Sequence, residues 1–259
     1  MEVIEKYIDY EVIVILFIVV VLWIHFYFLP QYLIDRLQCF FSSQQVIYCF
    51  RLTNQNTADR TVVALTIDDS PTDNTPAILD FLKLHGLKCT FFIISSQVIG
   101  REHIMKRIVD EGHELGNHSD TDCFNFLLSP SEFERSLRIC ESKIMNYVSN
   151  YNDASNIKWF RPGRALFNSS MLKTLNIHSY RLALANVYPH DANGLIKFQS
   201  NFPLLNAWYL RHRVRSGAII VLHDRPWTTA TMELAVPSLL ASFQFTTLSN
   251  ASQYYEKLA

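Results

Sequence analysis

The sequence predicts a barrel-like α/β domain of mostly parallel strands, preceded by one N-terminal transmembrane helix. Two observations support this prediction. Beyond residue 60, short apolar runs alternate with segments of helical periodicity, six or seven times in about 200 residues, which is typical of βαβ units. Before residue 60, an uncharged run extends from Val12 to Ile34. We therefore expect a tail at 1–11, a membrane helix at 12–34, a connector at 35–60 and an α/β domain at 61–259.

The N-terminal run has the length and composition of a membrane span. All 18 residues from Val12 to Leu29 are apolar except His25, and Pro30 ends the run. A helix of about 20 apolar residues crosses a hydrocarbon core of about 30 Å. A cleaved signal peptide is the alternative, but residues 1–11 are net acidic and no Ala-x-Ala cleavage site follows the run.

The first half of the α/β domain begins with a buried strand. Residues 62–67 (VVALTI) are short, apolar and β-branched, and two aspartates follow them. The helix expected next closes at Gly86, and Ser129 with Glu132 three residues later forms a capping-box pattern. The elements expected in order are strand 62–67, helix 75–85, strand 90–94, helix 101–111 and helix 129–148.

The second half repeats the alternation. Residues 218–222 (AIIVL) are the most apolar strand candidate. Asn168 is a suitable N-cap for the helix expected at 168–175. The elements expected in order are strand 158–160, helix 168–175, helix 202–214, strand 218–222, helix 231–242 and strand 245–248.

Composition excludes several classes of protein. Hydrophobic residues make up 49% and charged residues 18% of the chain, so it is not disordered. The net charge of -1 gives no basic excess, and we expect no nucleic-acid partner. Five cysteines lack zinc-finger spacing, and their odd number leaves at least one free thiol.

Charged and imidazole side chains follow three of the apolar segments. Asp68 and Asp69 follow strand 62–67, His118 and Asp122 follow the short segment 114–117, and His223 follows strand 218–222. The carboxyl ends of parallel strands converge on one face of such a domain, so polar residues there are candidates for chemistry. Three such groups together predict an active site.

The spacing of His118 and Asp122 suggests a metal site. On one helical turn, residues four apart point the same way, so both would bind one ion together with Asp69. One histidine and two carboxylates suit Zn²⁺, which we expect, and also Co²⁺, Mn²⁺ or Fe²⁺. Asp68 and His223 would then serve as base and acid.

Four motifs, taken in order, resemble the signatures of the polysaccharide deacetylase family, the carbohydrate esterase group with chitin and peptidoglycan deacetylases. The motifs are Leu65-Thr-Ile-Asp-Asp-Ser-Pro71, Gly112-His-Glu-Leu-Gly-Asn-His-Ser119, Phe160-Arg-Pro-Gly163 and Val221-Leu-His-Asp224. The resemblance extends over residues 61–248 and implies a distorted (β/α) barrel.

The resemblance implies a general base and three metal ligands. Asp68 matches the base, Asp69 the first ligand and His118 the second. The third ligand falls on Asp122, where the family usually has histidine. A second anionic ligand neutralises more of the charge of the ion than imidazole does, so the bound water is expected to be less acidic and harder ions to be favoured.

The resemblance also implies residues that orient the base and bind the substrate. Arg161 matches the arginine that orients the base. Pro162 and Gly163 stand where the family usually has Pro and an aromatic residue, whose backbone N–H helps to hold the oxyanion. We assign both, with Leu222 of the last motif, to substrate binding.

The resemblance also implies a general acid and a residue that holds it. His223 matches the general acid of the family. The residue that holds this histidine matches Asp191, in a motif whose local pattern is altered. The catalytic machinery expected from the resemblance is therefore Asp68, Arg161, Asp191 and His223.

The resemblance implies a metal-dependent hydrolase that removes acetyl groups, and we expect N-acetyl groups of N-acetylglucosamine glycans such as chitin to be the substrate. The alternatives are an O-acetyl or lipid-linked sugar deacetylase and a membrane-anchored glycan-binding protein with weakened catalysis. No oligomeric state is predicted.

The expected location rests on two opposed arguments. A glycan substrate would place the catalytic domain in the lumen or outside the cell. The positive charges flanking residues 12–34 differ by one and place it in the cytosol instead. We follow the substrate argument.

Overall fold

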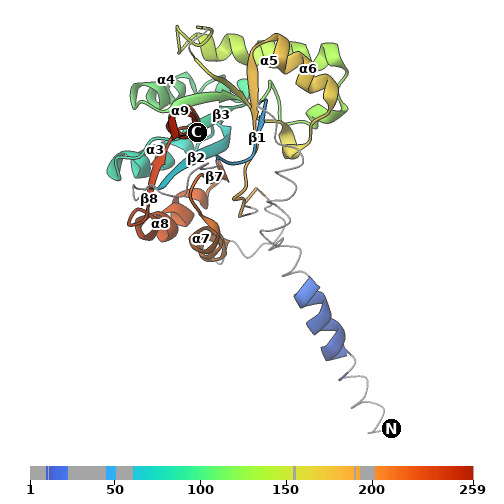
Figure 1. Cartoon of the computed structure of the whole chain (residues 1–259), viewed down its shortest axis with the longest axis vertical. Coiled ribbons are helices and arrows are strands. Elements are labelled where there is room, and N and C mark those ends of the chain that lie inside the picture. The colour runs from blue at the N-terminus through green and yellow to red at the C-terminus, as the bar shows by residue number, and fades with distance from the viewer. Residues whose placement is uncertain are drawn as a thin grey trace. The chain divides into compact units, whose positions relative to one another are not determined.

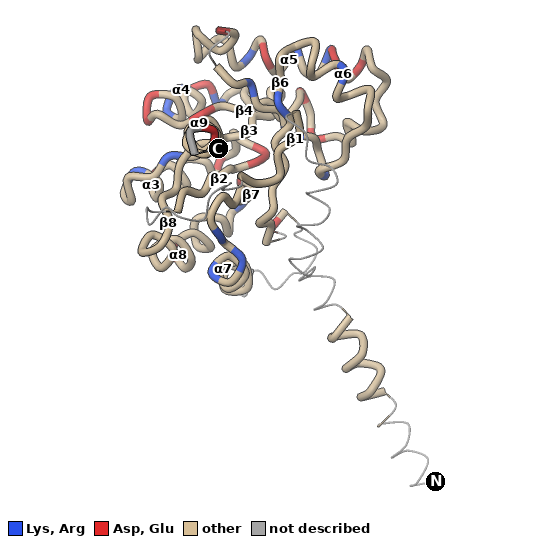
Figure 2. The backbone as a smooth tube through the Cα atoms, viewed as in Figure 1, with Lys and Arg blue, Asp and Glu red and all other residues tan. Residues whose placement is uncertain are grey.

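A computed structural model of the chain describes residues 10, 12–22, 45–50, 61–153, 156–189, 191–192 and 202–258. The chain divides into two units, residues 1–42 and 43–259. In the first unit, residues 12–22 form a helix without a charged residue (Figure 2). Within the described residues, no helix is both long enough and apolar enough to span a membrane. Residues 23–34 of the predicted span lie outside that part of the chain.

Among the described residues, the second unit is built on one parallel sheet of eight strands. Their order is β1-β6-β5-β4-β3-β2-β7, and β8 pairs with the first half of β2. The strands are β1 (Val46–Ile47), β2 (Thr61–Ser70), β3 (Thr90–Ile93), β4 (Glu114–Asn117), β5 (Lys158–Phe160), β6 (Tyr180–Ala183), β7 (Ile219–His223) and β8 (Phe243–Thr246). The predicted parallel α/β class is confirmed.

The two ends of the sheet approach one another through single residues. Val187, which follows β6, bridges to Ile220 of β7. The backbone N–H of Phe50, which follows β1, donates to the carbonyl of Gly217 at 2.8 Å. The sheet therefore curls so that its carboxyl-terminal strand ends surround one space.

Helices cover the outside of the sheet (Figure 1). Neighbouring helices pack in the pairs α3–α4, α3–α8, α7–α8 and α5–α6. Their bounds are α3 (Thr75–Leu84), α4 (Glu102–Asp110), α5 (Pro130–Met145), α6 (Ser169–Ile177), α7 (Phe202–Arg213), α8 (Thr228–Leu239) and α9 (Leu248–Leu258). The predicted capping box of Ser129 and Glu132 is present, and the Asn168 side chain accepts from the N–H of Met171.

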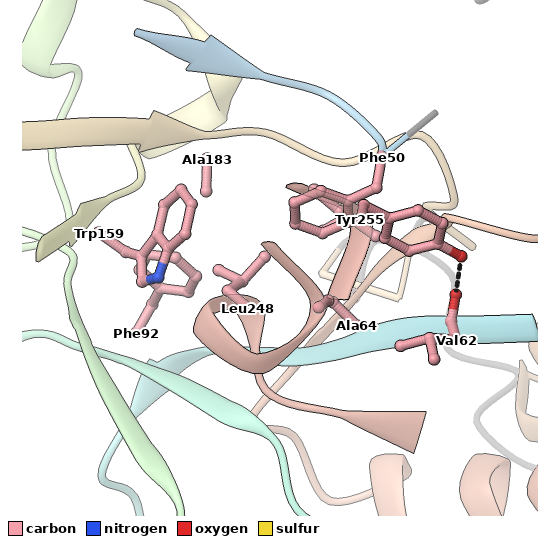
Figure 3. Close-up of a cluster of buried hydrophobic side chains, with 10 residues drawn as sticks. Phe50, Val62, Ala64, Phe92, Trp159, Ala183, Leu248 and Tyr255 are labelled. Carbon is pink, nitrogen blue, oxygen red and sulfur yellow. Dashed lines mark hydrogen bonds between the residues drawn. The ribbon is translucent and has the colours of Figure 1, made fainter. Parts of the chain in front are cut away.

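A hydrophobic core cluster joins buried side chains of the sheet to side chains of α9 (Figure 3). Tyr255 of α9 stacks on Phe50, and its hydroxyl donates to the carbonyl of Val62 at 2.7 Å. The prediction of a strand through Leu248 is wrong at its end, because β8 stops at Thr246 and Leu248 begins α9 as part of this core.

The predicted connector contains an edge strand. Val46 and Ile47 pair with Leu182 and Ala183 of β6, and Val46 is 2% exposed. Two residues carry little strand signal by themselves, so the pairing depends on contacts distant in the sequence. Residues 35–44 and 51–60 of the connector lie outside the described residues.

Candidate active site

The polar strand ends meet in one cavity of about 480 Å³. Asp68 and Asp69 belong to the end of β2, His118 and Arg161 directly follow β4 and β5, and His223 ends β7. All five line the cavity. The convergence predicted from the strand pattern is therefore present in the structure.

Asp68 and Arg161 form a buried ion pair. The Nη1 of Arg161 lies 2.7 Å from Oδ1 of Asp68, with side chains 4% and 5% exposed. The same Nη1 donates to the hydroxyl of Thr66, which lies two residues before Asp68 on β2. Burial lowers the pKa of the Arg161 guanidinium, although the charge of Asp68 acts in the opposite direction. The pair holds one oxygen of Asp68 in a fixed position.

The Arg161 guanidinium is held on every side. Its Nε donates to the carbonyl of Ala183 at 2.9 Å and its Nη2 to that of Leu184 at 3.1 Å. Its central carbon lies 4.2 Å from the ring centroid of Phe92. These contacts fix the plane of the guanidinium and therefore the direction in which it meets Asp68.

Asp69 and His118 form a second pair beside the first. The Nδ1 of His118 lies 2.6 Å from the backbone carbonyl of Arg161, which fixes the proton on Nδ1. The Nε2 then faces Oδ1 of Asp69 at 3.3 Å. Burial raises the pKa of the Asp69 carboxyl, but the hydrogen bond from His118 and the nearby positive charges outweigh it and hold the pKa well below its usual range.

Asp122 is exposed on the rim of the cavity, and the predicted helical turn from His118 to Asp122 is wrong. Residues 120–123 form bends, and Ser119 has a φ of 74°, outside the α region. Within the described part of the chain, no three His, Cys, Asp or Glu side chains form a ready cluster. Asp122 therefore lines the same cavity without lying against Asp69 and His118.

The residues present fit a divalent cation. His118 donates to Asp69 through Nε2 when its ring carries both protons, and once Nε2 loses its proton, a lone pair of Nε2 and a lone pair of Oδ1 of Asp69 face one another across 3.3 Å. A ligating histidine usually donates its other ring N–H to a carbonyl or carboxylate, as Nδ1 of His118 does to the Arg161 carbonyl. Asp69 and His118 would hold the cation, and Asp122 would complete the set from its loop.

His223 is held by Asp191. Oδ1 of Asp191 lies 2.9 Å from the Nδ1 of His223, and Oδ2 accepts from the His223 backbone N–H at 2.7 Å. Burial lowers the pKa of His223, but the charge of Asp191 and its hydrogen bond outweigh this and raise the pKa to about 8. The weak sequence match at Asp191 thus falls on the residue that contacts the imidazole.

Gly163 differs from its expected role. Its backbone N–H donates to Oδ1 of Asn125 at 2.8 Å, so this group is occupied within the chain. A Cβ at this position would overlap the carbonyl of Cys123. The loop after β4 therefore explains why glycine follows Pro162, and both residues line the cavity.

Leu222 lies on the other face of β7 from the site. It is 1% exposed and pairs in register with Ile67, whereas Val221 pairs with Thr66 and lines the cavity. Side chains alternate across a strand, so Leu222 points away from the cavity in which it was expected, and Val221 lines it instead.

Sequence reasoning missed several of the residues that line the cavity, among them Arg225, Tyr48 and Tyr188. Arg225 lies two residues beyond His223, and its Nη2 is 2.6 Å from Oδ2 of Asp69. Tyr48, which follows β1, and Tyr188, whose ring centroid is 5.7 Å from that of His223, also line the cavity. Only Arg225 carried a signal, as a charge next to a recognised motif.

We predict that Gly163→Ala lowers stability by about 1–3 kcal/mol, because overpacking against a backbone carbonyl forces the loop or the turn to move. Urea unfolding would measure the change. Ala165→Gly is the control in the same turn, since Ala165 has a φ of 57°, which glycine adopts without strain. Equal stability of Gly163→Ala and the wild type would contradict the steric account.

Three comparisons relate the chain to known proteins. A sequence model of the family described as polysaccharide deacetylase matches residues 55–183. The peptidoglycan-N-acetylglucosamine deacetylase of Bacillus cereus is 29% identical over 208 residues, which are 74% of this chain and 89% of that protein.

Solved structures agree in fold. A mutant of a Bacillus anthracis pseudoenzyme of carbohydrate esterase family 4, with restored enzymatic activity, has a TM-score of 0.69 at 24% identity, over 81% of this chain and 72% of that chain. A family 4 acetyl xylan esterase from Clostridium thermocellum, in complex with a cobalt ion, has a TM-score of 0.65 at 26% identity, over 74% and 91%.

Proposed function

Because the chain belongs to the polysaccharide deacetylase family, we propose that it is a metal-dependent hydrolase that removes N-acetyl groups from glycans containing N-acetylglucosamine. The observation that carries this proposal is the arrangement of Asp68 and His223. They are register partners on β2 and β7, and both line the cavity that contains Asp69 and His118. A base and an acid thus face one space beside a pair of metal-binding side chains.

Asp68 is the proposed base. Arg161 occupies Oδ1 of Asp68, so the second oxygen remains to accept a proton from water as that water attacks the acetyl carbonyl. A cation bound by Asp69, His118 and Asp122 would lower the pKa of a water molecule and polarise the carbonyl.

His223 is the proposed acid. Its Nδ1 is engaged by Asp191, so its Nε2 is the nitrogen available to donate a proton to the departing amine. Asp191 acts as a positioning residue, because it fixes the tautomer and the ring orientation and favours the protonated imidazole.

The pH dependence of the reaction follows from His223. An acid must be protonated, so we expect kcat/KM to fall as the pH rises through about 8, the raised pKa of His223. Asp191→Asn removes the charge that raises this pKa, so the alkaline limb should move toward the ordinary value of 6.5. A pH–rate profile of the wild type and of Asp191→Asn measures the alkaline limb of kcat/KM. If the limb does not move, a group other than His223 is responsible for it.

The proposal is tested by acetate release from acetylated chitooligosaccharides, peptidoglycan fragments and acetylated xylan, with Zn²⁺, Co²⁺ or Mn²⁺ added. Curated relatives include peptidoglycan and chitooligosaccharide deacetylases, which supports the amide substrates. Acetate from xylan alone would favour the O-acetyl esterase. Binding of oligosaccharides without acetate release by any metal form would favour the glycan-binding alternative.

We also propose that residues 12–34 anchor the chain in a membrane, with the catalytic domain in the lumen or outside the cell. The uncharged apolar run supports the anchor. Asn250 is exposed on α9 within an Asn-Ala-Ser sequence, whereas the Asn168 side chain caps α6. A glycosidase-sensitive mass shift lost in Asn250→Gln would support this location, and digestion of the domain by a protease added to the cytosolic side of intact vesicles would overturn it.

A further inference from the structure

Arg225 places a cation on one of the proposed metal ligands. Its Nη2 lies 2.6 Å from Oδ2 of Asp69, and the two side chains are 27% and 9% exposed. His118 faces the other oxygen of the same carboxylate. Both oxygens of Asp69 therefore have partners, and one of these partners is permanently charged.

The position of Arg225 is built into the fold. Its Nη1 donates to the carbonyl of Asp224 at 3.1 Å, so the guanidinium is tied to the end of β7. Asp224 is 1% exposed and accepts from the hydroxyls of Ser70 at 3.0 Å and Thr72 at 2.8 Å, in the segment that follows Asp69. The end of β2, which carries Asp69, and the segment after β7, which carries Arg225, are therefore held together by hydrogen bonds.

Arg225 differs from Arg161 and Arg164, which also line the cavity, in the residue with which it pairs. Arg161 is paired with Asp68 and lies away from Asp69 in the hydrogen-bond network. Arg164 is exposed, and its guanidinium lies 5.4 Å from the ring centroid of Phe124. Arg225 is thus the arginine whose ion pair involves a proposed ligand.

From this geometry we propose that Arg225 is an internal cation that competes with a divalent metal for Asp69 and so sets the metal affinity of the site. The inference rests on the proposed function for the identity of the ligands. A guanidinium at hydrogen-bond distance draws electron density from Oδ2 and repels a dication bound on the same carboxylate, strongly so in a site of low dielectric. Metal binding then requires Arg225 to leave Asp69 or to share it.

The test is the Zn²⁺ affinity of the full-length chain in detergent, measured by competition with a chromogenic chelator. Arg225→Met removes the charge and keeps an apolar stem of similar length, and we expect Zn²⁺ to bind at least about tenfold more tightly. Arg225→Lys keeps the charge, and its affinity should stay within about threefold of the wild type. Thermal unfolding of each variant verifies that it is folded.

Arg164→Met is the matched control, because it removes a cation from the same cavity that does not contact Asp69. Its Zn²⁺ affinity should stay within about twofold of the wild type. An unchanged affinity in Arg225→Met would overturn the inference, and so would an equal gain in both methionine variants, which would assign the effect to the general charge of the cavity.

Acetate release separates this inference from the proposed function. A wild type that releases acetate, combined with an unchanged affinity in Arg225→Met, defeats the inference alone. A wild type that binds Zn²⁺ more weakly than Arg225→Met but releases no acetate from any substrate defeats the proposed function and leaves the inference standing.

Discussion

Asp68→Asn is expected to lower kcat/KM by about 10²- to 10⁴-fold, the usual contribution of a general base, while the fold survives. Asparagine has nearly the shape of aspartate and still offers Arg161 an oxygen at the position of Oδ1. It cannot accept a proton from water. Since Asp68 is 5% exposed and lies in the paired centre of the sheet, the change alters chemistry more than packing.

Acetate release from an acetylated chitooligosaccharide gives kcat and KM for this variant, and chelator competition gives its Zn²⁺ affinity. The affinity should change little, because Asp69 and His118 keep their contact. Asp73→Asn is the control, since its side chain is 86% exposed and pairs with Arg101 at the surface. Activity of Asp68→Asn within threefold of the wild type would move the role of base to another group.

The parts of the fold that the sequence predicts are those in which the signal is local. The run 62–67 is β-branched and apolar because β2 is buried along its whole length. The Ser129 and Glu132 capping box satisfies the free N–H groups at the start of α5, and this requirement is met within four residues. Such elements were predicted at nearly their observed bounds.

The parts that were missed depend on distant contacts. β1 contains two residues, which acquire strand geometry only by pairing with β6. α9 has an ordinary polar sequence, but Leu248, Ala251 and Tyr255 fit the open end of the core. A local reading cannot supply the partner that makes either element stable.

The same distinction applies to the site. Asp68, Asp69, His118 and His223 lie at the ends of strands whose parallel pairing was predicted, so their convergence followed from topology. Arg161 was expected only from the family resemblance. Asp122 and Gly163 depend instead on the path of the loop after β4, where Ser119 has a φ of 74° and the Cys123 carbonyl approaches Gly163. Loop geometry of this kind does not follow from residue spacing.

Arg161→Met is expected to lower the free energy of unfolding by about 3–5 kcal/mol, the usual effect of breaking a buried ion pair on one side. The change leaves the carboxylate of Asp68 buried without its partner. It also removes the donor from the carbonyls of Ala183 and Leu184 and from the hydroxyl of Thr66. For a domain of this size, the loss corresponds to a fall in Tm of about 6–20 °C.

Urea unfolding followed by circular dichroism measures this loss, and a second variant protects the prediction if the first does not fold. Arg161→Met combined with Asp68→Asn removes the orphaned charge, so the double variant should recover about 1–3 kcal/mol relative to Arg161→Met. Arg181→Met is the surface control, because its pair with Glu256 is 38% and 58% exposed and should contribute at most about 1 kcal/mol. A double variant no more stable than Arg161→Met would mean that the carbonyl contacts, rather than the charge of Asp68, make Arg161 necessary. In that case Arg161 would serve mainly to hold the ends of β5 and β6 together through the carbonyls of Ala183 and Leu184. Its effect on Asp68 would be secondary.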